Sequence, residues 1–125
     1  MQAAQDGLNT TAIWSFVKTQ IDYVLGKNSL NLSYMVGFGN NFPLQPHHSG
    51  ASCPADHNIK CGWSDFHSSK PNPNVVHGAI VGGPDAGDNF DDSRDNYVQN
   101  EVSLNYNAGF QGLLAAAAEG VLQSY

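Results

Sequence analysis

The chain has 125 residues, of which 41% are apolar and 13% charged, and its formal net charge is −6. This length corresponds to one domain. The acidic balance argues against nucleic acids and anionic membranes as partners, because both require a basic surface. No apolar run approaches the ~20 residues that a membrane-spanning helix needs.

The first predicted helix spans about residues 10–25. Its apolar positions follow helical spacing and comprise Ile13, Phe16, Val17, Ile21, Val24 and Leu25. Asn9 or Thr10 can cap the start of this helix, and Gly26 stands where a glycine commonly ends one. The pattern therefore predicts an amphipathic helix with one buried face.

Little periodicity is visible in the middle of the chain. Residues 33–38 predict a short strand or a buried run, and residues 75–81 form a second short apolar run, for which a short helix is one interpretation. Residues 70–74, with the sequence KPNPN, are linker-like.

The second predicted helix spans about residues 105–122. Its apolar stripe comprises Phe110, Leu113, Leu114, Ala117 and Val121. Two helices joined by a loop of about 80 residues do not make a compact domain. We therefore expect this chain to be a piece of a larger protein.

Cys53 and Cys61 lie close together in a loop rich in Pro, Gly and Asp. We expect a disulfide, which in so short a loop contributes about 2–3 kcal/mol and indicates an oxidising, secreted environment. Two free thiols are one alternative. A zinc site with His57 is another, although the Cys-x7-Cys spacing is not that of a zinc ribbon and no second cysteine pair exists.

Acidic residues concentrate between Val81 and Gly109, beside aromatic residues and a single arginine, Arg94. These acids are Asp85, Asp88, Asp91, Asp92, Asp95 and Glu101. An exposed helix face would intersperse lysines among its acids, so the window indicates a sugar site, a metal site or general-acid chemistry. Calcium is the metal alternative, through Asp85, Asp88, Asp91 and Asp92, although the spacing is not that of an EF-hand loop.

The spacing inside this window resembles the C-terminal active-site signature of the glycoside hydrolase family 9 cellulases. The matching positions are Phe90, Asp92, Tyr97, Glu101, Ser103, Asn107 and Ala108. Residues 33–48 (SYMVGFGNNFPLQPHH) resemble the other signature of the family, in which a strand-like run leads to a loop with an active-site histidine. Residues 20–26 and 78–85 also match, in the family's order. The resemblance is closest to secreted animal endoglucanases, whose cysteine pair matches Cys53 and Cys61.

The resemblance implies hydrolysis of β-1,4-glucan with inversion of configuration, which needs two carboxyl groups about 6.5–9.5 Å apart. Glu101 matches the general acid, a role that neighbouring acids and aromatic walls would favour by keeping its carboxyl protonated. Asp92 matches a supporting acid, and His47 and Tyr106 match substrate contacts. The alternative for Glu101 is a solvated loop acid or a helix-start carboxylate, and the alternative for Tyr106 is a core tyrosine at the helix start. His48 has weaker support, and the remaining histidines, His57, His67 and His77, have none.

Two positions qualify this resemblance. Ser49 stands where the family usually has an arginine, two residues after the active-site histidine, and serine cannot offer the fixed donors of a guanidinium. Residues 85–88 read DAGD, the letters that carry the family's water-activating aspartate, but in the family that motif lies far toward the N-terminus. We therefore interpret Asp85 and Asp88 as turn-forming and structural acids, and place the water-activating aspartate outside this chain.

The resemblance implies an all-α fold, with residues 1–125 forming the C-terminal portion of one catalytic domain, an (α/α)6 barrel with long active-site loops. The expected function is hydrolysis of internal β-1,4-glucosidic bonds in cellulose or related β-glucans. The alternative is a truncated or degenerate relative that binds glucan weakly at most. No cofactor is required, and the expected partners are the glucan and the N-terminal remainder of the domain. The chain alone is expected to be inactive and to leave apolar faces of both helices uncovered.

Overall fold

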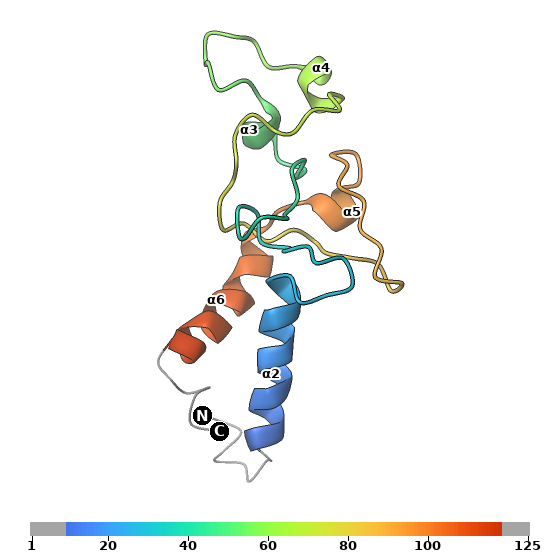
Figure 1. Cartoon of the computed structure of the whole chain (residues 1–125). Helices are drawn as coiled ribbons and strands as arrows, with labels where there is room; N and C mark the ends of the chain where they lie inside the picture. The colour runs from blue at the N-terminus through green and yellow to red at the C-terminus, as the bar shows by residue number, and fades with distance from the viewer. Residues whose placement is uncertain (1–9, 119–125) are drawn as a thin grey trace.

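The computed structural model describes residues 10–118 and consists of two long helices with loops between them. The helices are α2 (Thr10–Val24), α3 (Ser49–Ser52), α4 (Trp63–Phe66), α5 (Tyr97–Asn100) and α6 (Leu104–Ala118). Figure 1 shows α2 and α6 side by side, with the loops and the three short helices gathered at one end of this pair. The β structure within residues 10–118 is limited to three isolated bridges, so this part of the chain is all-α, as predicted.

Helix α2 matches the first predicted helix. It ends where expected, because Gly26 has a positive φ of 114° that glycine adopts without strain. There the N–H of Lys27 donates to the carbonyl of Asp22 at 2.8 Å. Asn9, a predicted cap, lies outside the described residues.

Helix α6 begins at Leu104, one residue before the predicted start. Ser103 caps it, because the Ser103 hydroxyl accepts from the N–H of Asn105 at 3.2 Å and the Ser103 carbonyl accepts from the N–H of Asn107 at 3.3 Å. The predicted end of this helix, with Val121 and Leu122, lies outside the described residues.

The two apolar runs of the middle segment pair with each other. The N–H of Val36 donates to the carbonyl of Ala79 at 2.8 Å, and the N–H of Val81 donates to that of Tyr34 at 3.1 Å. Residues 33–38 are thus a buried run, whereas the short helix predicted for residues 75–81 is wrong. A turn at His77 and Gly78 forms there instead, and the residues after it pair with residues 34–36, which satisfies their backbone polar groups.

Two small apolar clusters hold this arrangement together. One lies between α2 and α6 and contains Ile21, Ile80 and Phe110; the other lies under the loops and contains Tyr34, Val36 and Val81. Elsewhere the long helices stay uncovered, since 63% of Phe16 and 89% of Leu104 are exposed. Apolar faces of both helices are therefore open, as expected for a portion of a larger domain. No helix among residues 10–118 is long and apolar enough to cross a membrane.

The predicted disulfide between Cys53 and Cys61 is present, with Cα atoms 5.2 Å apart. It closes the loop that separates α3 from α4. The two alternatives, free thiols and a zinc site with His57, are wrong, because neither cysteine is left as a thiol.

Gly82 allows α5 to pack against the segment before the acidic loop. A Cβ atom at Gly82 would contact the carbonyl oxygen of Val98 and lie 3.1 Å from that of Gln99. Because both obstacles are backbone atoms, we expect Gly82→Ala to lower the free energy of unfolding by about 1–3 kcal/mol in a urea titration. Gly62→Ala is the matched control, since a Cβ there meets no atom within 4 Å. Equal midpoints for the two variants would contradict this packing.

Candidate active site

Glu101 lies at the C-terminal end of α5, where its backbone is held from two sides. Glu101 forms a parallel bridge with His47, and the next residue, Val102, forms an antiparallel bridge with Val81. The N–H of His47 donates to the carbonyl of Asn100 at 2.8 Å. The Glu101 side chain is exposed, so the structure fixes the backbone of this residue and leaves its carboxyl group free for chemistry.

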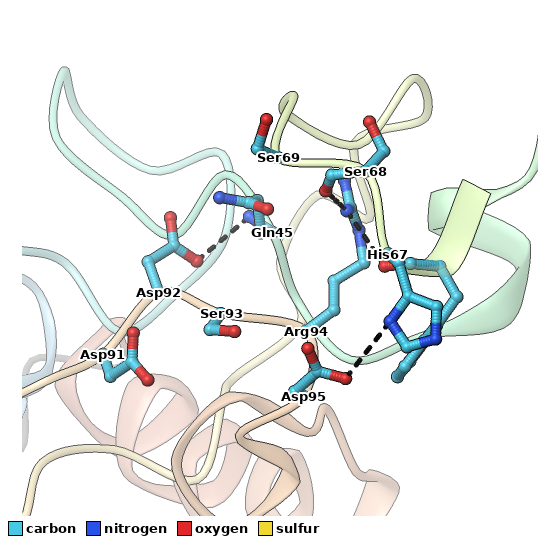
Figure 2. Close-up of a pocket in the computed structure, with 10 residues that line it drawn as sticks. Gln45, His67, Ser68, Ser69, Asp91, Asp92, Ser93, Arg94 and Asp95 are labelled. Atoms are coloured by element: carbon cyan, nitrogen blue, oxygen red, sulfur yellow. Dashed lines mark hydrogen bonds and ion pairs between the residues drawn. The ribbon is translucent and has the colours of Figure 1, made fainter. Parts of the chain in front are cut away.

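Asp92 binds the loop that leads to His47. Its carboxylate accepts from the backbone N–H groups of Leu44 at 2.7 Å and Gln45 at 3.0 Å, and from the side-chain amide of Asn100 at 3.0 Å. Figure 2 shows the carboxylate of Asp92 reaching toward Gln45. An acid so engaged suits the supporting role expected of it, because its oxygens are already occupied by donors.

Asn100 is a further positioning residue that sequence reasoning missed. It is fully buried, and its side-chain amide donates to the carbonyls of Gln45 at 2.9 Å and Ser93 at 3.3 Å as well as to Asp92. Asparagine is usually exposed, so nothing in the sequence beyond its place next to Glu101 could have marked it.

His47 has a fixed orientation and tautomer. Its Nδ1 atom lies 2.6 Å from the carbonyl oxygen of Arg94, and because a carbonyl only accepts, Nδ1 must carry the proton. In the neutral ring, Nε2 is then a free acceptor. The ring also packs edge-on against Phe66 at 5.8 Å and Tyr97 at 6.2 Å between ring centroids.

Arg94 is buried, with 3% of its surface exposed, and no carboxylate within residues 10–118 pairs with it. Its guanidinium donates instead to the side chain of Asn72 and to the carbonyls of Phe66, Ser68 and Lys70. Figure 2 shows the arginine extended toward Ser68. The linker-like tract at residues 70–74 is therefore anchored, and this part of the sequence interpretation is wrong.

Asn72 connects this anchor to the loop of His47. Its amide donates to the carbonyl of Pro46 at 3.0 Å while its oxygen accepts from Arg94. The loop at residues 66–72 is thereby held against the residue that precedes His47.

The pocket in Figure 2 has a volume of about 340 Å³ and lies between residues 66–69 and 91–95. Its lining is polar and includes three of the predicted acids. His67 Nδ1 and Asp95 Oδ1 lie 3.8 Å apart at its edge, and both side chains are exposed. Glu101 does not line this pocket, so the acidic window divides into a polar pocket and a separate carboxyl group.

Asp85 and Asp88 make the bonds of turn-forming and structural acids. Hydrogen bonds from Asn89 and from the N–H of Gly87 lower the pKa of Asp85. Asp88, with a positive φ of 62°, accepts from the hydroxyls of Tyr23 and Ser29. The bond to Asp88, together with burial, raises the pKa of Tyr23.

For the calcium alternative, no three His, Cys, Asp or Glu side chains within residues 10–118 come together as a metal site.

The remaining predicted residues are accessible. Tyr106 is 44% exposed on the first turn of α6. Ser49 is exposed at the start of α3.

Asn107, which also belongs to the motif around Glu101, has a structural role. Its side-chain amide accepts from the N–H of Ile80 at 3.1 Å and donates to the carbonyl of Gly78 at 2.7 Å.

Comparisons with known proteins identify the family of this chain. Residues 1–114 match the family model described as glycosyl hydrolase family 9. The chain belongs to glycosyl hydrolase family 9.

Its relatives include endoglucanases from plants. Endoglucanase 24 of rice (Oryza sativa subsp. japonica) is 50% identical over 119 residues, which cover 92% of this chain and 22% of that relative. Endoglucanase 2 of Persea americana is 48% identical over 107 residues, which cover 81% of this chain and 82% of that relative.

Solved structures show the same family. The endoglucanase of the termite Nasutitermes takasagoensis has 46% identity and a TM-score of 0.84, over 98% of this chain and 27% of that chain. The cellulase Cel9M of C. cellulolyticum, in complex with cellobiose, has 37% identity and a TM-score of 0.78, over 94% of this chain and 25% of that chain. The chain thus forms part of an (α/α)6 barrel and spans about a quarter of the rice and termite enzymes. Plant and termite identities are similar, so they do not single out an animal relationship.

The bonds of Asp92 predict a specific sensitivity. In Asp92→Asn, one oxygen becomes an NH2 group that faces a backbone N–H donor, so we expect unfolding free energy to fall by about 1.5–3 kcal/mol. Asp91→Asn is the matched control, since this neighbouring acid is exposed and should change stability by less than about 0.5 kcal/mol. Urea titrations of both variants measure the difference. Equal losses would show that the bonds from Leu44 and Gln45 do not hold the loop.

Proposed function

We propose that this chain is the C-terminal portion of the catalytic domain of a secreted endo-β-1,4-glucanase. The complete domain would hydrolyse internal β-1,4-glucosidic bonds in cellulose or related β-glucans with inversion of configuration. The observation that carries the proposal is the backbone bridge between His47 and Glu101, which joins the residue with the exposed carboxyl group to a histidine of fixed tautomer. The relatives support it, since those from rice and termite are called endoglucanases.

In this mechanism Glu101 is the general acid. Its carboxyl group donates a proton to the glycosidic oxygen as the bond to the leaving sugar breaks. Because the Glu101 side chain is exposed in this chain, the walls that exclude water from it would come from the rest of the barrel. Asp92 acts through position, by holding the loop of His47 next to Glu101.

Substrate contacts would come from His47 and Tyr106. The free Nε2 of His47 accepts from a glucosyl hydroxyl, and the exposed phenol of Tyr106 offers both a donor and an acceptor. The second catalytic carboxylate, which activates water on the opposite face of the sugar, lies in the N-terminal remainder of the domain. The proposed chemistry needs no cofactor, because two carboxyl groups supply both proton transfers.

Ser49 favours a second candidate, a degenerate relative that binds glucan weakly. Its hydroxyl carries no charge and one donor, whereas a guanidinium would carry five donors in a fixed fork. The two candidates differ in one measurable property, which is catalysis by a completed domain.

The proposed role of Glu101 is tested in a chimera in which this chain replaces the corresponding part of the termite endoglucanase. We expect the chimera to hydrolyse carboxymethylcellulose and Glu101→Gln to lower kcat by about 10²–10⁴-fold. Asp91→Asn removes a carboxylate from the same window and should leave kcat unchanged. A folded chimera without activity would favour the degenerate relative, and an active Glu101→Gln variant would remove Glu101 from the acid role.

The cost of Ser49 can be measured in the same chimera. Ser49→Arg should raise kcat/KM for carboxymethylcellulose by about 10–100-fold, which corresponds to one charged hydrogen bond. Ser49→Gln adds length without charge and is the control. An unchanged kcat/KM in Ser49→Arg would show that this position does not limit activity.

A further inference from the structure

A second pocket, of about 250 Å³, lies between α3 and α4 and shares His47 with the candidate active site. Its lining is neutral, since it contains no Lys, Arg, Asp or Glu among the described residues. The apolar part of the lining consists of Trp63, Phe66 and the Cys53–Cys61 disulfide. The polar part consists of His47, His48, Ser49 and Ser52. This composition suits an uncharged ligand that has both an apolar surface and hydroxyl groups.

Trp63 supplies the apolar surface. Its side chain is 76% exposed, yet its ring is held in place by two others. It meets Phe66 edge-on, with centroids 5.7 Å apart at 88°, and stacks on His67 at 5.9 Å and 22°. Phe66 in turn packs edge-on against His47. An exposed aromatic ring that is already ordered loses little conformational freedom when it binds a ligand.

His47 and His48 supply the polar groups, in opposite tautomers. The carbonyl of Arg94 fixes a proton on Nδ1 of His47 and leaves Nε2 as an acceptor. The reverse holds for His48, because its Nδ1 atom accepts from the N–H of Ala51 at 3.1 Å. In the neutral ring of His48 the proton is then on Nε2, which becomes a donor. The two histidines that line the pocket therefore carry one acceptor and one donor, and Trp63 lines the same pocket.

We infer that Trp63 and His48, together with His47, form a subsite for one β-1,4-linked glucosyl unit next to Glu101. This inference rests on the proposed function. A sugar hydroxyl both donates and accepts, which matches the two imidazole nitrogens, and the C–H face of a pyranose matches the indole ring. The occupant is a glucan because His47 belongs both to this pocket and to the bridge with Glu101.

The kinetic test uses the active chimera and cello-oligosaccharides of three to six units. Trp63→Ala should raise KM about tenfold or more for the oligomers long enough to reach the subsite, with little change for the shortest one. Trp63→Tyr should restore most of the affinity, since it keeps an aromatic face. Ile59→Ala is the matched control, because Ile59 is 57% exposed in the same disulfide loop and does not line the pocket. The same KM profile for Trp63→Ala and Ile59→Ala would overturn the inference.

His48 is tested by His48→Asn, which keeps an acceptor for the N–H of Ala51. We expect an unchanged unfolding midpoint and a higher KM for the longer oligomers. An unchanged KM would remove His48 from the subsite.

A binding test on the 125-residue chain separates the subsite from catalysis. The chain has two tryptophans, and Trp14 on α2 does not line the pocket. Cellotetraose at millimolar concentration should shift the indole N–H resonance of Trp63, assigned by its loss in Trp63→Phe, and leave that of Trp14 in place. Maltotetraose, with α-1,4 links, should shift neither. If the chimera is inactive but cellotetraose shifts the Trp63 resonance of the 125-residue chain, the proposed function is rejected and the subsite stands. If cellotetraose does not shift the Trp63 resonance, the subsite is rejected.

Discussion

The candidate active site depends on the carboxylate of Asp92. It binds two consecutive backbone N–H groups, those of Leu44 and Gln45, and the buried amide of Asn100. The loops that carry His47 and Glu101 have no sheet to satisfy their backbone groups, so a side chain must supply the partners. Joining segments almost 50 residues apart costs loop-closure entropy, and charge-assisted hydrogen bonds are strong enough to offset much of it.

Arg94, two residues later, orders the other side of the site. A buried charge normally requires an ionic partner, but this guanidinium distributes its donors over neutral oxygens, three of them backbone carbonyls of residues 66–70. The same residue orients His47 through its own carbonyl. Asp92 and Arg94 therefore act together. Asp92 fixes the loop before His47, and Arg94 fixes the loop that follows Trp63.

The motif around Glu101 contains more residues than proton transfer alone would require, because several of them hold the backbone in place. Asp92 holds a loop, Ser103 caps α6 and Asn107 anchors residues 78–80. Within residues 10–118 the Glu101 carboxyl makes no hydrogen bond of its own and stays exposed. In the proposed role of general acid, Glu101 must remain free to change its protonation state, so its position has to be set by neighbouring residues. The uncovered faces of α2 and α6 show the same logic at the scale of the fold, because the rest of the barrel must complete them.

The sequence alone determined the two long helices, the disulfide and the family, because helical periodicity, glycine termination and fixed motif spacing are local properties. It also gave the motif that contains Glu101. It did not determine the turn within residues 75–81 and the pairing that follows it, because short-range apolar patterns cannot distinguish such a run from a helix. Nor did it mark the buried side chains of Asn100 and Arg94, or the anchored tract at residues 70–74. Those depend on hydrogen bonds between segments distant in sequence, and only the tertiary structure decides which donors and acceptors meet.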